Sequence, residues 1–225
     1  MTTINDFNPD FRPHKRAKKI KLRYDAKSDR AIITLPRFTS KRTALKFASN
    51  HINWLIEQRI NSPKPVYLEH GSEIPILGFS KTIIHKPELP AQVDLTDDEI
   101  IVGGPLEGLS VRIENFLKKL ARKKIEPLAI AMAQKTNKSF RKIYIRDTKS
   151  RWGSCSSSGN LSFSWRLIMT PPDILEYVVA HEISHLSEMN HSHNFWAIVD
   201  TLVPNALQSR KWLRKDGQAL MLILK

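Results

Sequence analysis

The chain has 225 residues and a formal net charge of +14, and 41% of its residues are hydrophobic. This content supports a full core in one large domain or two small ones, and the single cysteine excludes an internal disulfide. No apolar run reaches the roughly 20 residues that span a bilayer, and the N-terminus does not resemble a signal peptide. We therefore expect a cytoplasmic protein without a membrane segment.

The excess of basic residues favours polyanionic partners, above all nucleic acid. Part of the charge is clustered, in residues 14–23, 118–124 and 210–215. Solvated basic faces that aid solubility explain these clusters as well, and no recognisable nucleic-acid-binding module accompanies them. Nucleic acid therefore stays an open partner, and the oligomeric state is not indicated.

The first part of the chain is predicted to be a hairpin and a helix after a flexible basic tail. The tail, residues 1–14, is polar and lacks periodicity. Two β-prone runs, 20–24 and 31–35, flank a polar turn and predict the hairpin. Apolar residues at helical spacing then predict one helix from Ser40 to about Arg59.

Short strand-like runs between Gly and Pro residues continue to residue 102, so we assign residues 15–108 to a strand-rich subdomain with one helix. Ser110 is predicted to cap a long helix that Pro127 interrupts. Strands at 142–146 and 161–168 follow, and the remainder is helical. Residues 109–225 thus form a second, mainly helical domain with a small sheet, which makes the protein α+β.

The stretch His181-Glu182-Ile183-Ser184-His185 places two histidines one helical turn apart. Residues at i and i+4 share a helix face, so both imidazoles can reach one metal ion, and the spacing suits zinc. Glu182 lies about 100° round the helix from His181, which puts it beside the ion without making it a ligand. It could therefore take a proton from water that the ion activates.

His191 is the candidate third ligand. In a continuous helix it would lie roughly 9 Å beyond His185 along the axis, out of reach of the same ion. We therefore predict that the helix ends between the two histidines, with Asn190 in the left-handed conformation that ends many helices. Three imidazoles would leave a fourth position open, which is the catalytic rather than the structural arrangement of zinc.

The residues before the motif predict the helix that carries it. Thr170 would cap this helix, and Pro171 would take its first helical position. Residues 174–180 are mostly apolar, so the helix should be mostly buried. Buried imidazoles and a buried carboxylate need polar partners, and a metal ion supplies one.

The segment Arg151-Trp152-Gly153-Ser154-Cys155 suggests close packing or a bulge at a strand end. If this strand lies at a sheet edge beside the metal, its free backbone groups could pair with an extended peptide. A tight turn that binds nothing explains the residues equally well. Cys155 could be a metal ligand or a nucleophile, although burial is the commoner fate of a lone cysteine.

Two more side chains are candidates for a role near the ion. Tyr177 precedes His181 by one turn on the same face, where it could contact that ligand or simply belong to the core. His193 rivals His191 as a ligand, and it could instead line the cleft and stabilise a developing oxyanion. Ser192 before it looks like the cap of the next helix, which favours His191 as the ligand.

Taken together, these stretches resemble the YgjP-like zinc metallopeptidases, a family related to the SprT-like proteases. The resemblance extends weakly from about Arg23 to Lys211 and is specific only from Arg151 to Trp196. The stretches that carry it are residues 151–155, 161–168, 177–186 and 190–196.

The resemblance implies a β-rich N-terminal part followed by a zincin-like catalytic domain. It implies zinc on His181, His185 and His191, with Glu182 as the base. Trp152 and Arg166 belong to the matching stretches, and we expect them to contact the substrate or support the ligands.

We therefore predict a zinc-dependent metallopeptidase that acts on peptides or proteins. Two alternatives stay open. One is a metal amidase for small or formylated substrates that uses Cys155 together with His181 and His185. The other is a basic nucleic-acid-binding protein whose metal is structural, which predicts a filled fourth ligand position.

Overall fold

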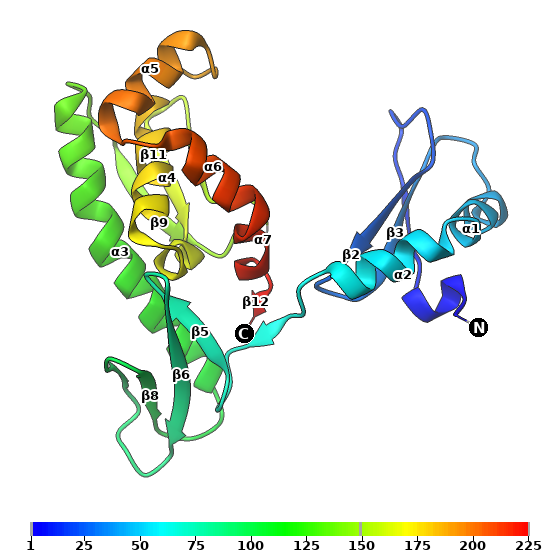
Figure 1. Cartoon of the computed structure of the whole chain (residues 1–225), viewed down its shortest axis with the longest axis horizontal. Helices are drawn as coiled ribbons and strands as arrows, with labels where there is room; N and C mark the ends of the chain where they lie inside the picture. The colour runs from blue at the N-terminus through cyan, green and yellow to red at the C-terminus, as the bar shows by residue number, and fades with distance from the viewer. Residues whose placement is uncertain (1, 149, 225) are drawn as a thin grey trace. The chain divides into compact units, whose positions relative to one another are not determined.

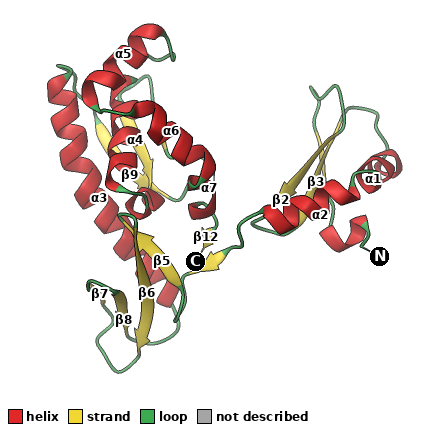
Figure 2. Ribbon diagram, in the orientation of Figure 1, coloured by secondary structure: helices red, strands yellow, loops and turns green. Residues whose placement is uncertain are grey.

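The computed structural model describes residues 2–148 and 150–224, which form two compact units that meet between Pro65 and Val66 (Figure 1). Each unit has its own hydrophobic core. Both combine helices with small sheets, which confirms the α+β class (Figure 2). None of the described helices is long and apolar enough to cross a bilayer.

Unit 1, residues 1–65, is a three-stranded sheet covered on one face by helices. In chain order its elements are η1 (Ile4–Phe7), β1 (Asp10–Pro13), β2 (Lys21–Asp25), β3 (Arg30–Leu35), α1 (Lys41–Ser49) and α2 (Ile52–Asn61). The strand order is β1-β3-β2; β1 runs parallel to β3, and β2 pairs with β3 antiparallel. This pairing confirms the predicted hairpin.

Alternating residues of β3 build the core of unit 1. Ala31, Ile33 and Leu35 point to the helix side because side chains alternate along a strand. They pack with Phe7 and with small residues of α1. The first residues are therefore not the predicted flexible tail, because Phe7 is fully buried and β1 pairs with β3.

The helix predicted from Ser40 to Arg59 is two helices. Ser40 does cap the first, since its hydroxyl accepts a hydrogen bond from the amide of Thr43. The chain then leaves helical geometry at Asn50 and His51. The imidazole Nδ1 of His51 lies 2.8 Å from the carbonyl oxygen of Phe47, at the end of α1. Polar residues that bond to nearby backbone favour such breaks over helix interiors.

Unit 2 contains all remaining described elements. Its strands are β4 (Val66–Tyr67), β5 (Glu73–Ile76), β6 (Phe79–Lys86), β7 (Val93–Leu95), β8 (Glu99–Gly103), β9 (Lys142–Arg146), β10 (Gly153–Cys155), β11 (Asn160–Ser164) and β12 (Ile223–Leu224). Its helices are α3 (Leu109–Lys135), η2 (Trp165–Met169), α4 (Pro172–Ser184), α5 (His193–Leu202), α6 (Ala206–Lys215) and α7 (Gly217–Leu220).

Three sheets belong to unit 2, with strand orders β5-β6-β8-β7, β10-β11-β9 and β12-β4 among the described residues. The strand-rich segment 66–103 shares one core with α3 and α4. The units therefore divide at residue 65, whereas the sequence predicted a boundary at residue 108. The Gly-rich turn before α3 connects elements of a single core.

Helix α3 continues through Pro127, although the sequence predicted an interruption there. Its buried residues extend on both sides of the proline and pack against η2 and α4; they include Leu117, Ala121, Ile125 and Ala129. A proline inside a helix costs about 3 kcal/mol, and burial of a few apolar side chains at about 1.5–3 kcal/mol each offsets that cost.

The small sheet β10-β11-β9 presents one face to the helices. Leu161 and Phe163 of β11 are fully buried on that face. The predicted strand 161–168 ends early, because residues 165–169 form the 3-10 helix η2. Helix α4 begins at Pro172, and the hydroxyl of Thr170 donates to the carbonyl of Leu167 at the end of η2 instead of capping α4.

Candidate metal centre

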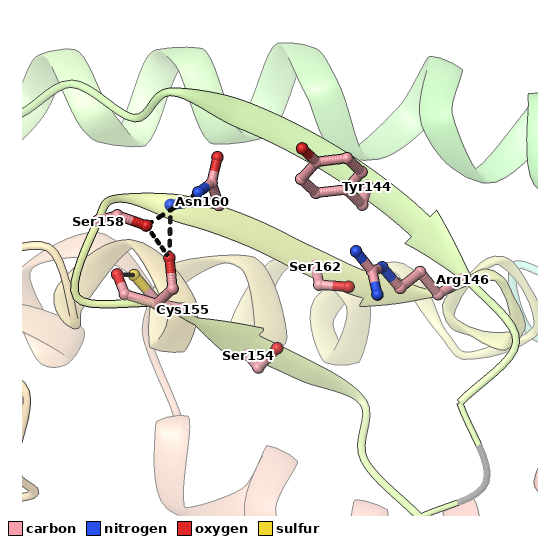
Figure 3. A pocket seen from close by; sticks show the side chains of 8 residues that line it. Tyr144, Arg146, Ser154, Cys155, Ser158, Asn160 and Ser162 are labelled. Atoms are coloured by element: carbon pink, nitrogen blue, oxygen red, sulfur yellow. Dashed lines mark hydrogen bonds between the residues drawn. The ribbon is translucent and has the colours of Figure 1, made fainter.

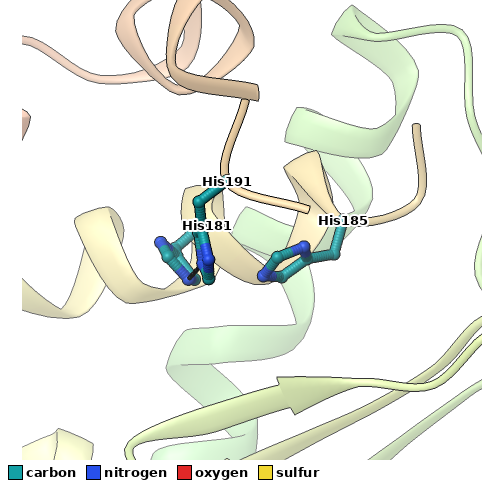
Figure 4. A group of neighbouring side chains, drawn as sticks. All are labelled: His181, His185 and His191. Atoms are coloured by element: carbon teal, nitrogen blue, oxygen red, sulfur yellow. Dashed lines mark hydrogen bonds between the residues drawn. The ribbon is translucent and has the colours of Figure 1, made fainter. Parts of the chain in front are cut away.

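Three imidazoles meet where α4 ends. His181 lies in the last turn of α4, His185 is the residue that directly follows this helix, and His191 lies on the segment that leads into α5 (Figure 4). One ligand atom from each ring lies within 4.8 Å of the other two, and the Nε2 atoms of His181 and His191 are 3.1 Å apart. The sequence predicted this convergence.

The chain between His185 and His191 turns without the predicted left-handed residue. Helix α4 ends at Ser184, and Asn190 is not among the described residues with positive φ. Asn190 instead accepts a hydrogen bond from the amide of Ser192 through its side-chain oxygen. Ser192 then caps α5 by accepting from the amide of Phe195, as predicted.

The Nδ1 atoms of His181 and His185, which point away from the other imidazoles, each lie near a polar group. The Nδ1 of His185 lies 3.0 Å from the carbonyl oxygen of Glu188. The Nδ1 of His181 lies 3.5 Å from the hydroxyl of Tyr177, whose side chain is buried. Such contacts fix ring orientation and direct the Nε2 atoms to a common point.

Burial favours the neutral, metal-binding form of His181 and His185. Burial, together with neighbouring His185 and His191, lowers the pKa of His181 to about 3. Burial also lowers the pKa of His185. Burial raises the pKa of Tyr177 to about 12, so its hydroxyl keeps its proton. His181 and His185 therefore offer uncharged nitrogen donors at neutral pH.

Aromatic residues that sequence reasoning did not place at the site enclose the histidines. The ring of Phe195 lies 4.6 to 4.9 Å from all three imidazoles. Trp196 stacks on His191 at 5.9 Å, and the guanidinium of Arg210 from α6 lies 4.3 Å from the Trp196 ring centre. The sequence shows Arg210 only as part of a basic run, because the contact depends on how α6 packs.

Glu182 is buried beside β10, the strand that contains Gly153. A Cβ at Gly153 would lie 2.6 Å from both Cγ and Oε1 of Glu182, so only glycine fits there. Burial raises the pKa of Glu182 to about 8, and the charge of Arg151 partly opposes the rise. A carboxyl with this pKa can both accept and release a proton near neutral pH.

Cys155 does not belong to the histidine group among the described residues. Its thiol lies 3.5 Å from the carbonyl oxygen of Ser156. Burial, and then the charge of Glu182, raise the pKa of the Cys155 thiol to about 11. A thiol with such a pKa is a poor nucleophile at neutral pH.

A polar pocket of about 410 Å³ lies on the outer face of the small sheet (Figure 3). The histidines do not line it. The residues that do are Tyr144, Arg146, Ser154, Cys155, Ser156, Ser158, Asn160 and Ser162. Alternate residues on the same strands, such as Phe163, are buried against the helices, so the pocket and the helices lie on opposite faces of the sheet.

The remaining predicted site residues are Trp152, Arg166 and His193. The ring of Trp152 packs against Gly217 at the start of α7, where an added Cβ would approach it to 3.0 Å. Arg166 is buried and donates to the carbonyl of Ile223 and to Asp147, so it joins the C-terminal strand to the sheet. His193 is exposed at the start of α5.

Comparison with known proteins identifies a family and a similar solved structure. Among curated proteins, none matches this chain. The crystal structure of the metallopeptidase zymogen of Pyrococcus abyssi abylysin is similar at 20% identity and a TM-score of 0.38, and the match covers 42% of this chain and 96% of that one. The model of the YgjP-like metallopeptidase domain matches residues 18–216. The chain therefore belongs to the YgjP-like family of metallopeptidases.

Proposed function

We propose that this protein is a zinc-dependent peptidase whose ligands are His181, His185 and His191 and whose general base is Glu182. The observation that carries the proposal is the convergence of three imidazoles within 4.8 Å beside a buried carboxyl. Membership of a metallopeptidase family supports the same conclusion.

The donor set fits zinc. Tetrahedral zinc with nitrogen ligands at about 2.0–2.1 Å requires ligand atoms roughly 3.3 Å apart. The 3.1 Å separation of the His181 and His191 Nε2 atoms is close to that value. Three protein ligands and a remaining position are the pattern of a catalytic zinc site. The described residues offer no fourth His, Cys, Asp or Glu in the group, which disfavours a structural metal.

The chain's own residues move the protons. When bound, zinc polarises the scissile carbonyl and lowers the pKa of a water molecule at the remaining position. Glu182 takes the proton of that attacking water on its carboxylate and then donates it to the leaving amine. The buried position of Glu182 keeps its pKa close to neutrality, where both transfers are efficient.

Strand β10 is the element that we expect to hold the peptide. It forms the edge of the small sheet, with β11 as its neighbour in the strand order. Gly153 places this edge directly against Glu182. An extended substrate that pairs with β10 would therefore pass next to the base and the histidines.

Removal of the metal should abolish peptide hydrolysis, and zinc should restore it. The histidines are the only source of the site's metal affinity in this proposal, so metal content should reach one ion per chain. Zinc at a hundredfold excess over its Kd should stabilise the fold by about 2.7 kcal/mol. Hydrolysis of a denatured protein substrate, metal analysis and thermal unfolding measure these effects. Full activity after exhaustive chelation would refute the proposal.

Gly153→Ala should lower hydrolysis about 100-fold while zinc stays bound, because displacement of a catalytic group by about 1 Å costs that much. The new methyl group would collide with the Glu182 carboxyl and push it from its place. Ser154→Ala is the matched control, since this neighbour lies on the outer face of β10. Equal activity of both variants would show that the Glu182 position is not critical.

A further inference from the structure

The positive charge of the chain is concentrated in unit 1. Residues 1–65 contain 15 lysines and arginines and five acidic residues, whereas residues 66–225 contain 21 and 17. Unit 1 thus holds +10 of the net charge of +14 in under a third of the length. The metal centre lies in unit 2, so peptide hydrolysis does not account for this charge.

Strand directions gather the cations at one end of the unit 1 sheet. Strands β1 and β3 are parallel and end side by side, and the antiparallel β2 begins at that same end, with Lys21 opposite Thr34. The connections after β1 and after β3 both leave from there (Figure 1). We call the cations of this region the basic end: Lys15, Arg16, Lys18, Lys19, Lys21, Arg37, Lys41 and Arg42.

Acidic residues are kept away from the basic end. Segments 11–24 and 31–56 contain no aspartate or glutamate. Asp25 is the last residue of β2 and Asp29 lies in the β2–β3 turn, both at the opposite end of the sheet. The carboxylate of Asp29 pairs there with Arg59, 2.7 Å away. The cations of the basic end are exposed, so their charges add to one local positive potential.

One exposed aromatic ring stands within the basic end. Phe38 is 94% exposed, the highest value among the exposed large hydrophobic residues described. Its φ of 68° lies in the left-handed region, which is strained for a bulky side chain. Arg37 lies 5.0 Å from the Phe38 ring centre. The chain thus adopts a strained backbone and exposes an aromatic face, and Phe38 is not among the described residues that pack in or against the core of unit 1.

We propose that unit 1 binds single-stranded nucleic acid through the basic end, with phosphates on the cations and an unpaired base stacked on Phe38. Single strands are bound by positive surfaces with aromatic rings on which bases stack. A duplex keeps its bases stacked on each other and would leave Phe38 without a partner. An anionic bilayer is the lesser fit, because α1 turns its small apolar residues Ala44 and Ala48 into the core and offers no apolar face.

The test is a binding titration of the full chain with labelled single-stranded DNA and, separately, RNA of about 20 nucleotides, repeated at several salt concentrations. Comparison of the two titrations shows whether the basic end prefers single-stranded DNA or single-stranded RNA. The logarithm of the affinity should fall linearly with the logarithm of salt, by about 0.7 per phosphate contact. Thermal unfolding and peptide hydrolysis are recorded for each variant to show that both units are intact.

A four-cation variant should lower the affinity at least about tenfold near 0.1 M salt and reduce the salt slope by about 3. It carries Lys15→Gln, Arg16→Gln, Lys18→Gln and Lys19→Gln. The matched control removes the same charge from exposed positions on α3 in unit 2 and should bind as well as the natural chain. It carries Lys119→Gln, Lys123→Gln, Lys124→Gln and Lys135→Gln.

Phe38→Ala should weaken binding about 5- to 100-fold with an unchanged salt slope, because stacking is not a charge effect. Phe38→Trp should bind as tightly as the natural chain, because tryptophan also stacks on bases. Phe79→Ala, which removes an exposed ring in unit 2, should leave the affinity unchanged. Absence of binding at low salt, or equal losses in both four-cation variants, would overturn the proposal. Binding to vesicles with anionic lipid but not to oligonucleotides would assign the surface to membranes and overturn it as well.

Discussion

The Glu182→Gln protein should bind zinc like the natural chain and hydrolyse peptides about 1,000-fold more slowly, since general acid–base catalysis contributes roughly 100- to 10,000-fold. Glutamine keeps the shape and the contact with Gly153, but its amide cannot accept the proton of the attacking water. Steady-state hydrolysis and metal analysis on the same preparation separate the two effects.

Glu188→Gln is the matched control for this substitution. Glu188 contacts the site through its backbone carbonyl, which lies 3.0 Å from His185 Nδ1, and its side chain has no role in the proposed mechanism. The control should keep both metal and activity. If Glu182→Gln cleaves as fast as the natural chain, another group must be the base.

His191→Ala should lower zinc affinity at least about 100-fold, because substitution of a group that merely supports a ligand already costs 10- to 100-fold. His191 supplies the third nitrogen and lies 3.1 Å from the Nε2 of His181. His193→Ala is the matched control, since this exposed histidine lies two residues further on and should leave zinc binding unchanged. Competition with a chelator of known affinity measures both variants.

Cys155→Ser tests the alternative in which Cys155, together with His181 and His185, binds the metal. We expect it to keep its zinc, because the thiol lies outside the histidine group of the described residues and its pKa is about 11. If Cys155→Ser lost its zinc and His191→Ala kept it, Cys155 and not His191 would be the third ligand. That result would favour the amidase alternative.

The residues that the sequence predicted best are close to one another along the chain. His181 and His185 share a face because helix geometry fixes it, and His191 follows once the helix ends. The reason for the turn was not predictable in detail: Asn190 acts through its side-chain oxygen on Ser192, and not through a left-handed backbone.

Features that depend on distant packing were missed or misjudged. Arg210 reaches Trp196 only because α5 and α6 both pack against α4, and no local pattern reports that contact. Pro127 suggested a helix break, but packing on both sides of it outweighs the local preference. Phe7 lies in a polar stretch that reads as a tail, and its burial depends on the β1–β3 pairing.

The two ends of unit 2 lie side by side. Val66, its first residue, is aligned with Ile223 in the parallel pair β12–β4, where neighbouring strands are about 5 Å apart. A unit whose ends meet in this way can be inserted into a loop of another protein, or relinked with new ends, without reaching across its own surface. Unit 2, which carries the candidate metal centre, therefore has the geometry of a domain that tolerates insertion into another chain and circular permutation.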